Sequence, residues 1–383
     1  GVEMEFVYVL DTEAPVEIMV WLPQLKAFCT AEDMTHNMHN LQTLRGAKVR
    51  NGLLWSKAID TAIERYGDQV EVSFSTHHWP TWGNERIVDY WEAQRDMYRY
   101  LHDQTLHLAN RGLTPDEIAE EMKLPASLAS QFNCRGYYGT LSHNVKAQYD
   151  LYFGWFNGNP AHLNPLPPSE LGSKYVEAIG GADKVLEVAK ASYAKGEYRW
   201  VATLLDNLVF AEPENKEARR LLADTYTQLG YQAESGPWRN FYLTGARDLF
   251  KKDVPYTSQL INDGVLAQMD MGTLLDYCAI QLNGEKAAGK EAVININFTD
   301  TKEKVMLMLN NGVLNHRLDS QDEKADLTLE IEKMDFIKLF FGRTDLQTLL
   351  KTNKVRTTGN TQAMDVICSA YEPADPNFKI VLP

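Results

Sequence analysis

The sequence predicts a multidomain chain with an α/β part, an all-helical part and an α+β part, in that order. Three observations predict this division. Residues 1–112 alternate short apolar runs with helical patterns, residues 113–252 show almost only helical patterns, and residues 253–383 combine a helical stretch with runs of alternating polarity. A length of 383 residues also exceeds what one hydrophobic core normally serves, so several domains are expected.

Short strand-like runs in the first part each lead into a polar segment. These runs cover residues 6–10, 27–29 and 70–74. The spacing of apolar residues predicts one helix that begins near Thr35 and another over residues 55–66. Strands alternating with helices are typical of α/β domains.

Local start and stop signals predict the next helices. We expect a long helix that has Asn84 as its N-cap and ends at residues 110–112, where Gly112 suits the left-handed position after a helix. Thr114 followed by Pro115 predicts another helix start, because proline fits the first helical position.

Helical hairpins are predicted over residues 182–235, and residues 191–198 resemble the turn of a TPR unit. About one and a half such units are too few for a free-standing solenoid. We therefore expect a neighbouring domain or a partner chain to support this part.

The third part begins with a predicted helix over residues 258–282. Strands are expected over residues 292–298, 304–309 and 327–331, with a hairpin turn at 310–312, so the sheet is predicted to be antiparallel. Several methionines in this part either line a cavity or simply fill a core. They are Met269, Met271, Met306, Met308 and Met334.

The net charge of −14 argues against nucleic acid or an anionic membrane surface as the main partner. An anionic substrate would need a local positive centre, such as a metal ion or an arginine. No run of 18 apolar residues occurs, so no transmembrane helix is expected.

The N-terminal residues 1–5 lack the basic start and the apolar stretch of a signal peptide. Residues 6–10 have the pattern of a strand inside a sheet. We therefore expect the chain to be a piece of a longer polypeptide.

Carboxylates and histidines follow three of the strand-like runs. Glu13 and Glu17 follow the first run, Glu32 follows the second, and the adjacent His77 and His78 follow the third. Strand ends at one edge of a sheet are where α/β enzymes place their sites, and mixed histidine and carboxylate ligands are typical of catalytic zinc. A matching His-rich motif is absent from the sequence, so the pattern predicts half of a metal site.

Several motifs resemble the zinc-dependent alkyl sulfatases of the metallo-β-lactamase superfamily. The resemblance is carried by Glu32 and by residues 35–41, 44–47, 54–57, 77–83, 94–98, 103–106 and 135–139. The C-terminal region is similar to a sterol-carrier-protein-like domain. Together these likenesses cover essentially the whole chain.

The resemblance implies a fold for each part. Residues 1–112 would be the C-terminal part of an αββα catalytic domain, residues 113–252 a helical dimerisation domain, and residues 253–383 a sterol-carrier-protein-like domain. It also implies two zinc ions per complete protomer, a homodimer, an alkyl sulfate substrate and a periplasmic or secreted location.

One motif of that family is missing. The H-x-H-x-D-H motif, which supplies four of the usual zinc ligands, does not occur among the nine histidines of this sequence. Two alternatives follow: either another chain, such as a separate N-terminal fragment, provides the first half of the site, or this chain alone is inactive.

By resemblance, Glu13, Glu32 and His77 are the metal ligands. Glu13 could otherwise be a surface carboxylate, and Glu32 could stabilise the start of the helix expected near Thr35. Glu17 and Asp33 are the alternatives if the alignment shifts by one motif position. His78 is the alternative to His77, because adjacent residues at a strand end point in different directions.

The resemblance makes Arg45 a sulfate-binding residue, since a guanidinium matches a tetrahedral oxyanion; the alternative is a surface salt bridge. Tyr138 is the second catalytic candidate. Tyr137, Tyr138 and His143 either face the mouth of the active site or serve aromatic packing. His36 and His39 have a helical i,i+3 spacing, which fits either polar packing or support of the metal ligands.

These observations predict hydrolysis of alkyl sulfate esters to an alcohol and sulfate at a dinuclear zinc site in the complete enzyme. One alternative is a non-catalytic lipid-binding and dimerisation module. Another is a different hydrolase of the metallo-β-lactamase fold, such as a thioesterase or phosphodiesterase.

Overall fold

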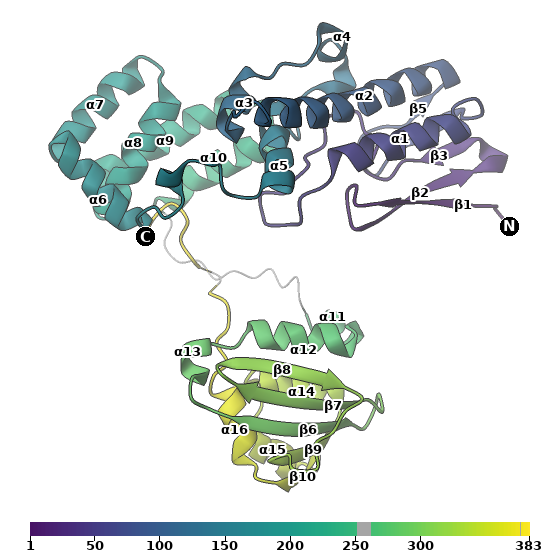
Figure 1. Cartoon of the computed structure of the whole chain (residues 1–383), viewed down its shortest axis with the longest axis vertical. Helices are drawn as coiled ribbons and strands as arrows, with labels where there is room; N and C mark the ends of the chain where they lie inside the picture. The colour runs from purple at the N-terminus through teal and green to yellow at the C-terminus, as the bar shows by residue number, and fades with distance from the viewer. Residues whose placement is uncertain (251–261, 376) are drawn as a thin grey trace. The chain divides into compact units, whose positions relative to one another are not determined.

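A computed structural model describes residues 1–250, 262–375 and 377–383 (Figure 1). The chain divides into two compact units. One unit consists of Gly1–Lys252 together with Lys379–Pro383, and the other of Asp253–Phe378. The predicted first and second parts thus share one unit, and a boundary near residue 113 stays a prediction.

The first unit begins with a five-stranded sheet in the order β1-β2-β3-β4-β5. Its strands are β1 (Glu5–Leu10), β2 (Val16–Leu22), β3 (Ala27–Cys29), β4 (Val72–Phe74) and β5 (Thr81–Trp82). Only β3 and β4 run parallel; the other neighbouring strands are antiparallel. The three strand-like runs of the sequence are confirmed, with the third shortened at its start.

Two long helices, α1 (Gly52–Tyr66) and α2 (Asn84–Ala109), contribute to the core beside this sheet. Aromatic rings fill the contact: the rings of Phe28 and Trp91 lie 5.3 Å apart, and those of Trp21 and Tyr66 lie 5.2 Å apart. Burial of such rings is the main stabilising contribution of a core. Both helices match their sequence predictions, except that Gly83 rather than Asn84 occupies the N-cap.

The helix predicted near Thr35 does not exist. The segment from residue 30 to residue 50 has no helix, although much of it is buried. Its backbone instead bonds a distant loop: the Met38 amide donates to the Arg135 carbonyl (3.0 Å), and the Gly139 amide donates to the Met38 carbonyl (2.8 Å). His36 and His39 therefore do not lie on one face of a helix, as their i,i+3 spacing had indicated.

The rest of the first unit is helical. Its helices are α3 (Pro115–Glu121), α4 (Ala126–Ala129), α5 (Leu141–Phe153), α6 (Pro168–Ile179), α7 (Ala182–Ala194), α8 (Tyr198–Ala211), α9 (Lys216–Gln232) and α10 (Gly236–Asp248). The helix start predicted at Thr114-Pro115 is confirmed, and Thr114 also forms a capping box with Glu117. Gly112 has a φ of 91°, as its predicted left-handed position requires. The hairpins of α7 to α9 are confirmed; their likeness to a TPR unit stays a prediction.

The second unit is an α+β domain with a five-stranded sheet in the order β10-β9-β6-β7-β8. Its elements are α11 (Asp263–Gln268), α12 (Met271–Ile280), α13 (Gly284–Ala287), β6 (Ala292–Phe298), β7 (Lys304–Asn310), β8 (Val313–Leu318), β9 (Leu327–Ile331), α14 (Lys333–Phe340), α15 (Leu346–Lys351), β10 (Val355–Gly359) and α16 (Gln362–Cys368). The three predicted strands are confirmed, and a turn lies at Asn311-Gly312, where both residues have positive φ. This turn joins β7 to β8, a strand that was not predicted, and not to the run at 327–331. The prediction of a purely antiparallel sheet was wrong, because β6 and β9 pair in parallel.

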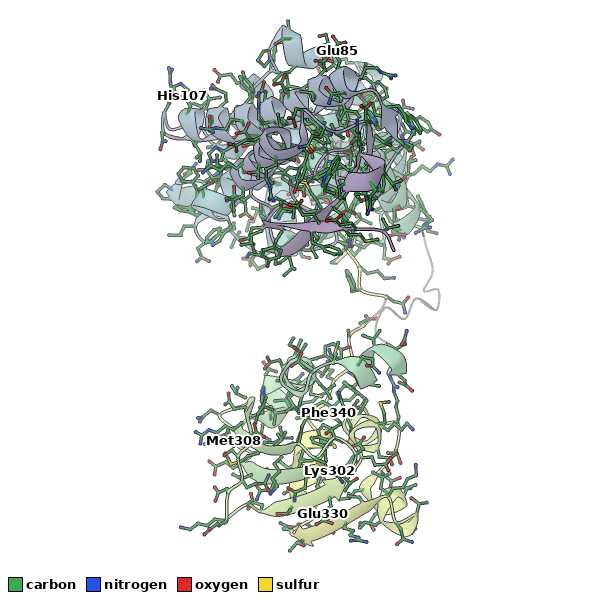
Figure 2. The ribbon with its side chains drawn as sticks, turned by 90° about the vertical axis from the view of Figure 1, so that its right-hand side faces the viewer. Glu85, His107, Lys302, Met308, Glu330 and Phe340 are labelled. Carbon is green, nitrogen blue, oxygen red and sulfur yellow. The ribbon has the colours of Figure 1, made fainter. Side chains whose placement is uncertain are left out.

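Apolar side chains fill the core of this second unit. Phe340, labelled in Figure 2, is 1% exposed, and Met271 and Met306 are also buried. Met271 belongs to the core and thus follows the core alternative, whereas Met306 is buried but lies outside this core cluster. Residues 258–261 of the predicted helix lie outside the described residues. In the ranges that the structure describes, no helix is long and apolar enough to cross a bilayer.

Candidate functional site

The topology of the first sheet brings the predicted ligands to one edge. Glu13 lies in the turn between β1 and β2, Glu32 follows β3 and His77 follows β4. Because β3 is antiparallel to β2 and parallel to β4, the turn and both strand ends share that edge. Three segments far apart in sequence therefore converge, as expected.

Glu32 and His77 form the centre of this edge. His77 Nε2 lies 3.6 Å from Glu32 Oε1, and their side chains are 45% and 23% exposed. The His39 ring lies 5.8 Å from the His77 ring, and the Tyr138 ring lies 4.8 Å from that of His39. Within the described ranges, no group of three or more His, Cys, Asp or Glu side chains has metal-binding geometry.

Glu13 is held by Arg50. The buried Arg50 guanidinium forms an ion pair with Glu13 Oε1, and its Nε donates to the Glu13 carbonyl at 2.8 Å. Its Nη1 donates to the carbonyl and the side-chain oxygen of Asn40 at 2.7 and 2.6 Å. Arg50 thus links the β1–β2 turn to the polar segment after β3.

Acidic groups outnumber cations at this centre. Asp33 is fully buried, and neither of its carboxylate oxygens has a hydrogen-bond partner among the described residues. Burial raises the pKa of Asp33 well above its usual value, and the charges of Glu17 and Glu32 add to this effect. Partial burial likewise raises the pKa of Glu17, with further contributions from Glu32 and Glu13. Burial is thus the main reason that both carboxyls favour the neutral form.

His39 is a buried neutral imidazole. Burial, reinforced by Arg50, lowers its pKa to about 3. Its Nδ1 lies 3.1 Å from the Asn40 carbonyl, closer than the 3.4 Å contact with Arg50 Nη1. We therefore assign the proton to Nδ1, which donates to Asn40 and leaves Nε2 unprotonated.

His36 and His78 are occupied elsewhere. His36 Nε2 lies 2.8 Å from Thr81 Oγ1, and its ring stacks on Trp79 at 5.1 Å. The Asn37 amide donates to His78 Nε2 at 2.5 Å. The geometry thus brings His77, and not His78, beside Glu32.

The other predicted residues differ in their surroundings. Arg45 lies on an exposed loop, and its guanidinium has no hydrogen bond or ion pair with any described residue. Tyr138 is half-buried beside His39 and His77, whereas the Tyr137 hydroxyl donates to the His36 carbonyl.

His143 has a packing role. Its Nε2 donates to the Gln42 carbonyl at 2.7 Å, while Trp238 Nε1 donates to its Nδ1 at 3.0 Å. Burial lowers the pKa of His143, so the neutral ring that these two bonds require is favoured. Both ring nitrogens are therefore engaged.

Sequence reasoning missed Arg50 and Asn40. Neither residue lies in a strand-end pattern, and their connection depends on contacts between β1–β2 and the segment before α1. The only sequence signal was indirect: both belong to a polar stretch in which Arg45 and His39 had been noticed.

The fold and this centre define a mixed-sheet domain with carboxylates and imidazoles at one sheet edge. Two family models match the chain. "Alkyl sulfatase dimerisation" matches residues 114–252, and "Alkyl sulfatase C-terminal" matches residues 259–383.

Curated relatives and a solved structure agree with these models. A "Linear primary-alkylsulfatase" of Pseudomonas sp. is 45% identical over all of this chain and 57% of its own length. A second protein of that name, from Pseudomonas sp. (strain ATCC 19151), is 31% identical over 98% of this chain and 72% of its own length. The solved structure of the stereoselective inverting sec-alkylsulfatase Pisa1 from Pseudomonas sp. superposes with a TM-score of 0.96 at 41% identity, covering 100% of this chain and 60% of that one.

The chain therefore belongs to the alkylsulfatase family. The chain spans less than two thirds of the length of several of these relatives. It covers 57% of the first Pseudomonas relative and 60% of the solved structure.

Proposed function

We propose that the whole protein hydrolyses alkyl sulfate esters at a dinuclear zinc site, to which this chain contributes Glu13, Glu32 and His77. The observation that carries the proposal is the meeting of Glu32 and His77 at the sheet edge, in a chain of the alkylsulfatase family.

The donor geometry supports zinc. Two ligands about 2.0–2.1 Å from one tetrahedral ion lie about 3.3 Å apart. His77 Nε2 and Glu32 Oε1 are 3.6 Å apart, so a small adjustment would let both reach one ion. Glu13 engages Arg50 through Oε1, which leaves its Oε2 for a metal. When bound, zinc supplies a Lewis acid that activates water for attack on the ester.

An apolar sheet face supports completion of the site by the rest of the protein. Val7 and Val9 of β1 are buried against the helices, whereas the alternate residues face outward. Those outward residues are large and exposed on β1 and β2: Phe6 (65%), Tyr8 (54%), Leu10 (52%), Val16 (63%) and Ile18 (42%). A contiguous apolar face of this kind requires a covering layer. We propose that the missing half of a metallo-β-lactamase fold covers it and brings the H-x-H-x-D-H ligands.

Sulfate binding falls to Arg45 in this proposal. Its guanidinium is exposed and unpaired among the described residues, and Gly46 with a φ of 86° lets the loop turn beside it. A free guanidinium can bind a sulfate oxyanion bidentately. Tyr138 lies beside His39 and His77, where its hydroxyl could orient the leaving oxygen.

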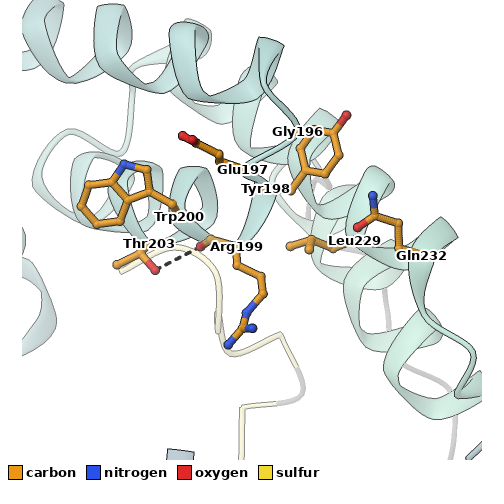
Figure 3. Close-up of a pocket in the computed structure, with 8 residues that line it drawn as sticks. All are labelled: Gly196, Glu197, Tyr198, Arg199, Trp200, Thr203, Leu229 and Gln232. Carbon is orange, nitrogen blue, oxygen red and sulfur yellow. Dashed lines mark hydrogen bonds between the residues drawn. The ribbon is translucent and has the colours of Figure 1, made fainter. Parts of the chain in front are cut away.

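We also propose that the protein is a homodimer that uses the helical part of the first unit. The dimerisation family model matches residues 114–252. An apolar groove of about 820 Å³ lies there between α6 and α8, with Leu171, Tyr175 and Trp200 in its wall. Figure 3 shows a neighbouring pocket that shares Trp200 and Thr203 with this groove. Exposed aromatic side chains beside a groove are typical anchors of a protein interface.

Family resemblance supports a sterol-carrier-protein-like fold for the second unit and a periplasmic or secreted location. A non-catalytic lipid-binding and dimerisation module is the competing function, and another hydrolase of the same fold is the second competitor. Metal content and substrate choice separate the three.

The test measures zinc content and sulfate release for the whole protein and for matched variants. We expect about two zinc ions per protomer and turnover of an alkyl sulfate. His77→Ala and Glu32→Gln should lower both zinc content and turnover. The controls are His107→Ala and Glu85→Gln, because both side chains are exposed on α2 (Figure 2).

A whole protein without zinc and without turnover would favour the lipid-binding module. Turnover of a phosphodiester or thioester in preference to an alkyl sulfate would favour the other hydrolases. Equal zinc content in His77→Ala and His107→Ala would remove His77 from the ligand set.

A further inference from the structure

A set of stacked rings lies beside the candidate site. The ring of Trp79 stacks on the ring of His36 at 5.1 Å and on the ring of Phe132 at 6.2 Å. Tyr137 contacts Phe132 at 5.6 Å and His78 at 5.7 Å. We call these five side chains the aromatic wall.

Much of the aromatic wall is open to solvent. Trp79 is 55% exposed and Phe132 is 54% exposed, although both are large apolar side chains. Their rings stack on each other, so their exposed surfaces adjoin. An apolar surface of this kind marks a binding site more often than a structural feature.

The aromatic wall is continuous with the candidate ligands. His77 and His78 are adjacent in sequence, as are Tyr137 and Tyr138. His77 and Tyr138 face each other at 6.2 Å on the ligand side, and His78 and Tyr137 face each other at 5.7 Å on the wall side. The same two loops thus build a polar surface and an apolar surface side by side.

Hydrogen bonds fix this arrangement in advance of binding. The Tyr137 hydroxyl donates to the His36 carbonyl, and His36 Nε2 pairs with Thr81 Oγ1 at 2.8 Å. The Asn37 amide holds the His78 ring. A rigid apolar surface binds a flexible chain at a lower entropic cost than one that must be ordered.

We propose that the aromatic wall binds the alkyl chain of the sulfate ester, close to its sulfate group. This inference rests on the proposed function, since it assigns a binding site to the alkyl chain of the same substrate. The substrate has an anionic head and an apolar tail. The surface matches it, because in each of the two loops one residue faces the candidate ligands and its sequence neighbour belongs to the aromatic wall. It assigns tail recognition to the first unit, whereas the sequence left open whether methionines of the second unit line a cavity or fill a core.

The experiment compares kcat/KM of the whole protein for linear alkyl sulfates of increasing length. Burial of one methylene changes affinity by about fourfold. In the wild type, we expect log kcat/KM to rise with carbon number until the wall is covered. In Trp79→Ala and Phe132→Ala, this slope should fall.

Trp82→Ala is the control. Trp82 is 59% exposed on β5, three residues from Trp79, and its ring contacts no ring of the wall among the described residues. It should keep the wild-type slope. Equal slopes in wild type and both wall variants would overturn the inference. So would a loss of folding stability in Trp79→Ala with an unchanged slope, which would mean that another part of the protein covers the wall.

Binding of linear alkyl sulfonates separates failure of this inference from failure of the proposed function. A sulfonate keeps the anionic head and the tail but has no ester bond to hydrolyse. If the wild type turns over no sulfate ester, the proposed function fails. The wall would still be supported by sulfonate binding that tightens with chain length in the wild type and in Trp82→Ala but not in Trp79→Ala; length-independent binding would overturn it.

Discussion

At the scale of single residues, Arg50 is the cation on which the acidic centre depends. It pairs with Glu13 and bonds Asn40 while its own side chain is 8% exposed. Arg50→Met should lower the free energy of unfolding by about 3–5 kcal/mol, because it leaves Glu13 and Asn40 without their partner. Denaturant unfolding measures this loss. Arg45→Met is the matched control, because the exposed Arg45 should contribute within about 0.5 kcal/mol.

Asp206 on α8 tests the effect of a half-buried carboxyl on stability. Burial raises its pKa above the usual value, and it has no hydrogen bond with a described residue. A carboxyl whose pKa is higher in the folded than in the unfolded protein destabilises the fold when it is ionised. This destabilisation is absent below the pKa of the unfolded state and appears as the pH rises through the pKa of the folded state. Asp206→Asn should therefore stabilise the protein near neutral pH, and this gain should vanish in acid.

Thermal unfolding at several pH values and one protein concentration measures the Asp206 effect. Asp68→Asn is the control, since Asp68 is exposed and follows α1. An Asp206→Asn gain that is independent of pH, or equal to that of Asp68→Asn, would show that burial of the charge is not its cause.

At the scale of elements, the site depends on two loops that lie against each other. Gly139 lies against the backbone of His39 and Asn40: an added Cβ would be 2.7 Å from the His39 carbonyl oxygen and 2.8 Å from the Asn40 nitrogen. Gly139→Ala should therefore separate the loops and destabilise the protein by about 1–3 kcal/mol.

The Gly139→Ala effect is measured by thermal unfolding together with zinc content of the whole protein. Gly236→Ala is the control, because a Cβ there would meet only the Tyr137 carbonyl oxygen at 3.7 Å, an ordinary contact. Zinc content that stays at the wild-type level in Gly139→Ala would mean that the loop contact does not position the ligands.

Elements with local signals were predictable, and elements held by distant contacts were not. The helix start at Thr114-Pro115 and the positive-φ turn at Asn311-Gly312 are encoded within a few residues, so α3 and the turn after β7 were found. The strand that follows this turn, β8, was not predicted. Residues 35–41 have a helical apolar spacing, yet their backbone bonds residues 135–139, which no local pattern reveals.

In the candidate site, too, some residues were predictable from local sequence signals and others were not. Glu32 and His77 follow strands, and a strand end can be read from the sequence. Arg50 could not be found, because Glu13 and Asn40 reach it only after the sheet and the loop have folded.

At the scale of the whole molecule, the chain leaves the first unit and returns to it. Lys379–Pro383 belongs to the first unit, where Val381 and Leu382 pack against the core of its helices. Val381 Cγ1 would lie 3.5 Å from a Cβ built on Gly245 of α10. The second unit is therefore connected to the first at both of its ends.

This return predicts a long-range effect of the C-terminal residues on the first unit. The double variant Val381→Ala/Leu382→Ala removes half-buried apolar side chains from the helical core and should destabilise the first unit by about 1–3 kcal/mol. Hydrogen exchange should show faster opening of α9 and α10, with no change in β6 and β7 of the second unit. Ile380→Ala is the control, since Ile380 belongs to the same C-terminal segment but is 70% exposed. Equal exchange in the double variant and the control would mean that the C-terminal residues do not stabilise the first unit. Faster exchange in β6 and β7 would mean that the two units do not unfold independently.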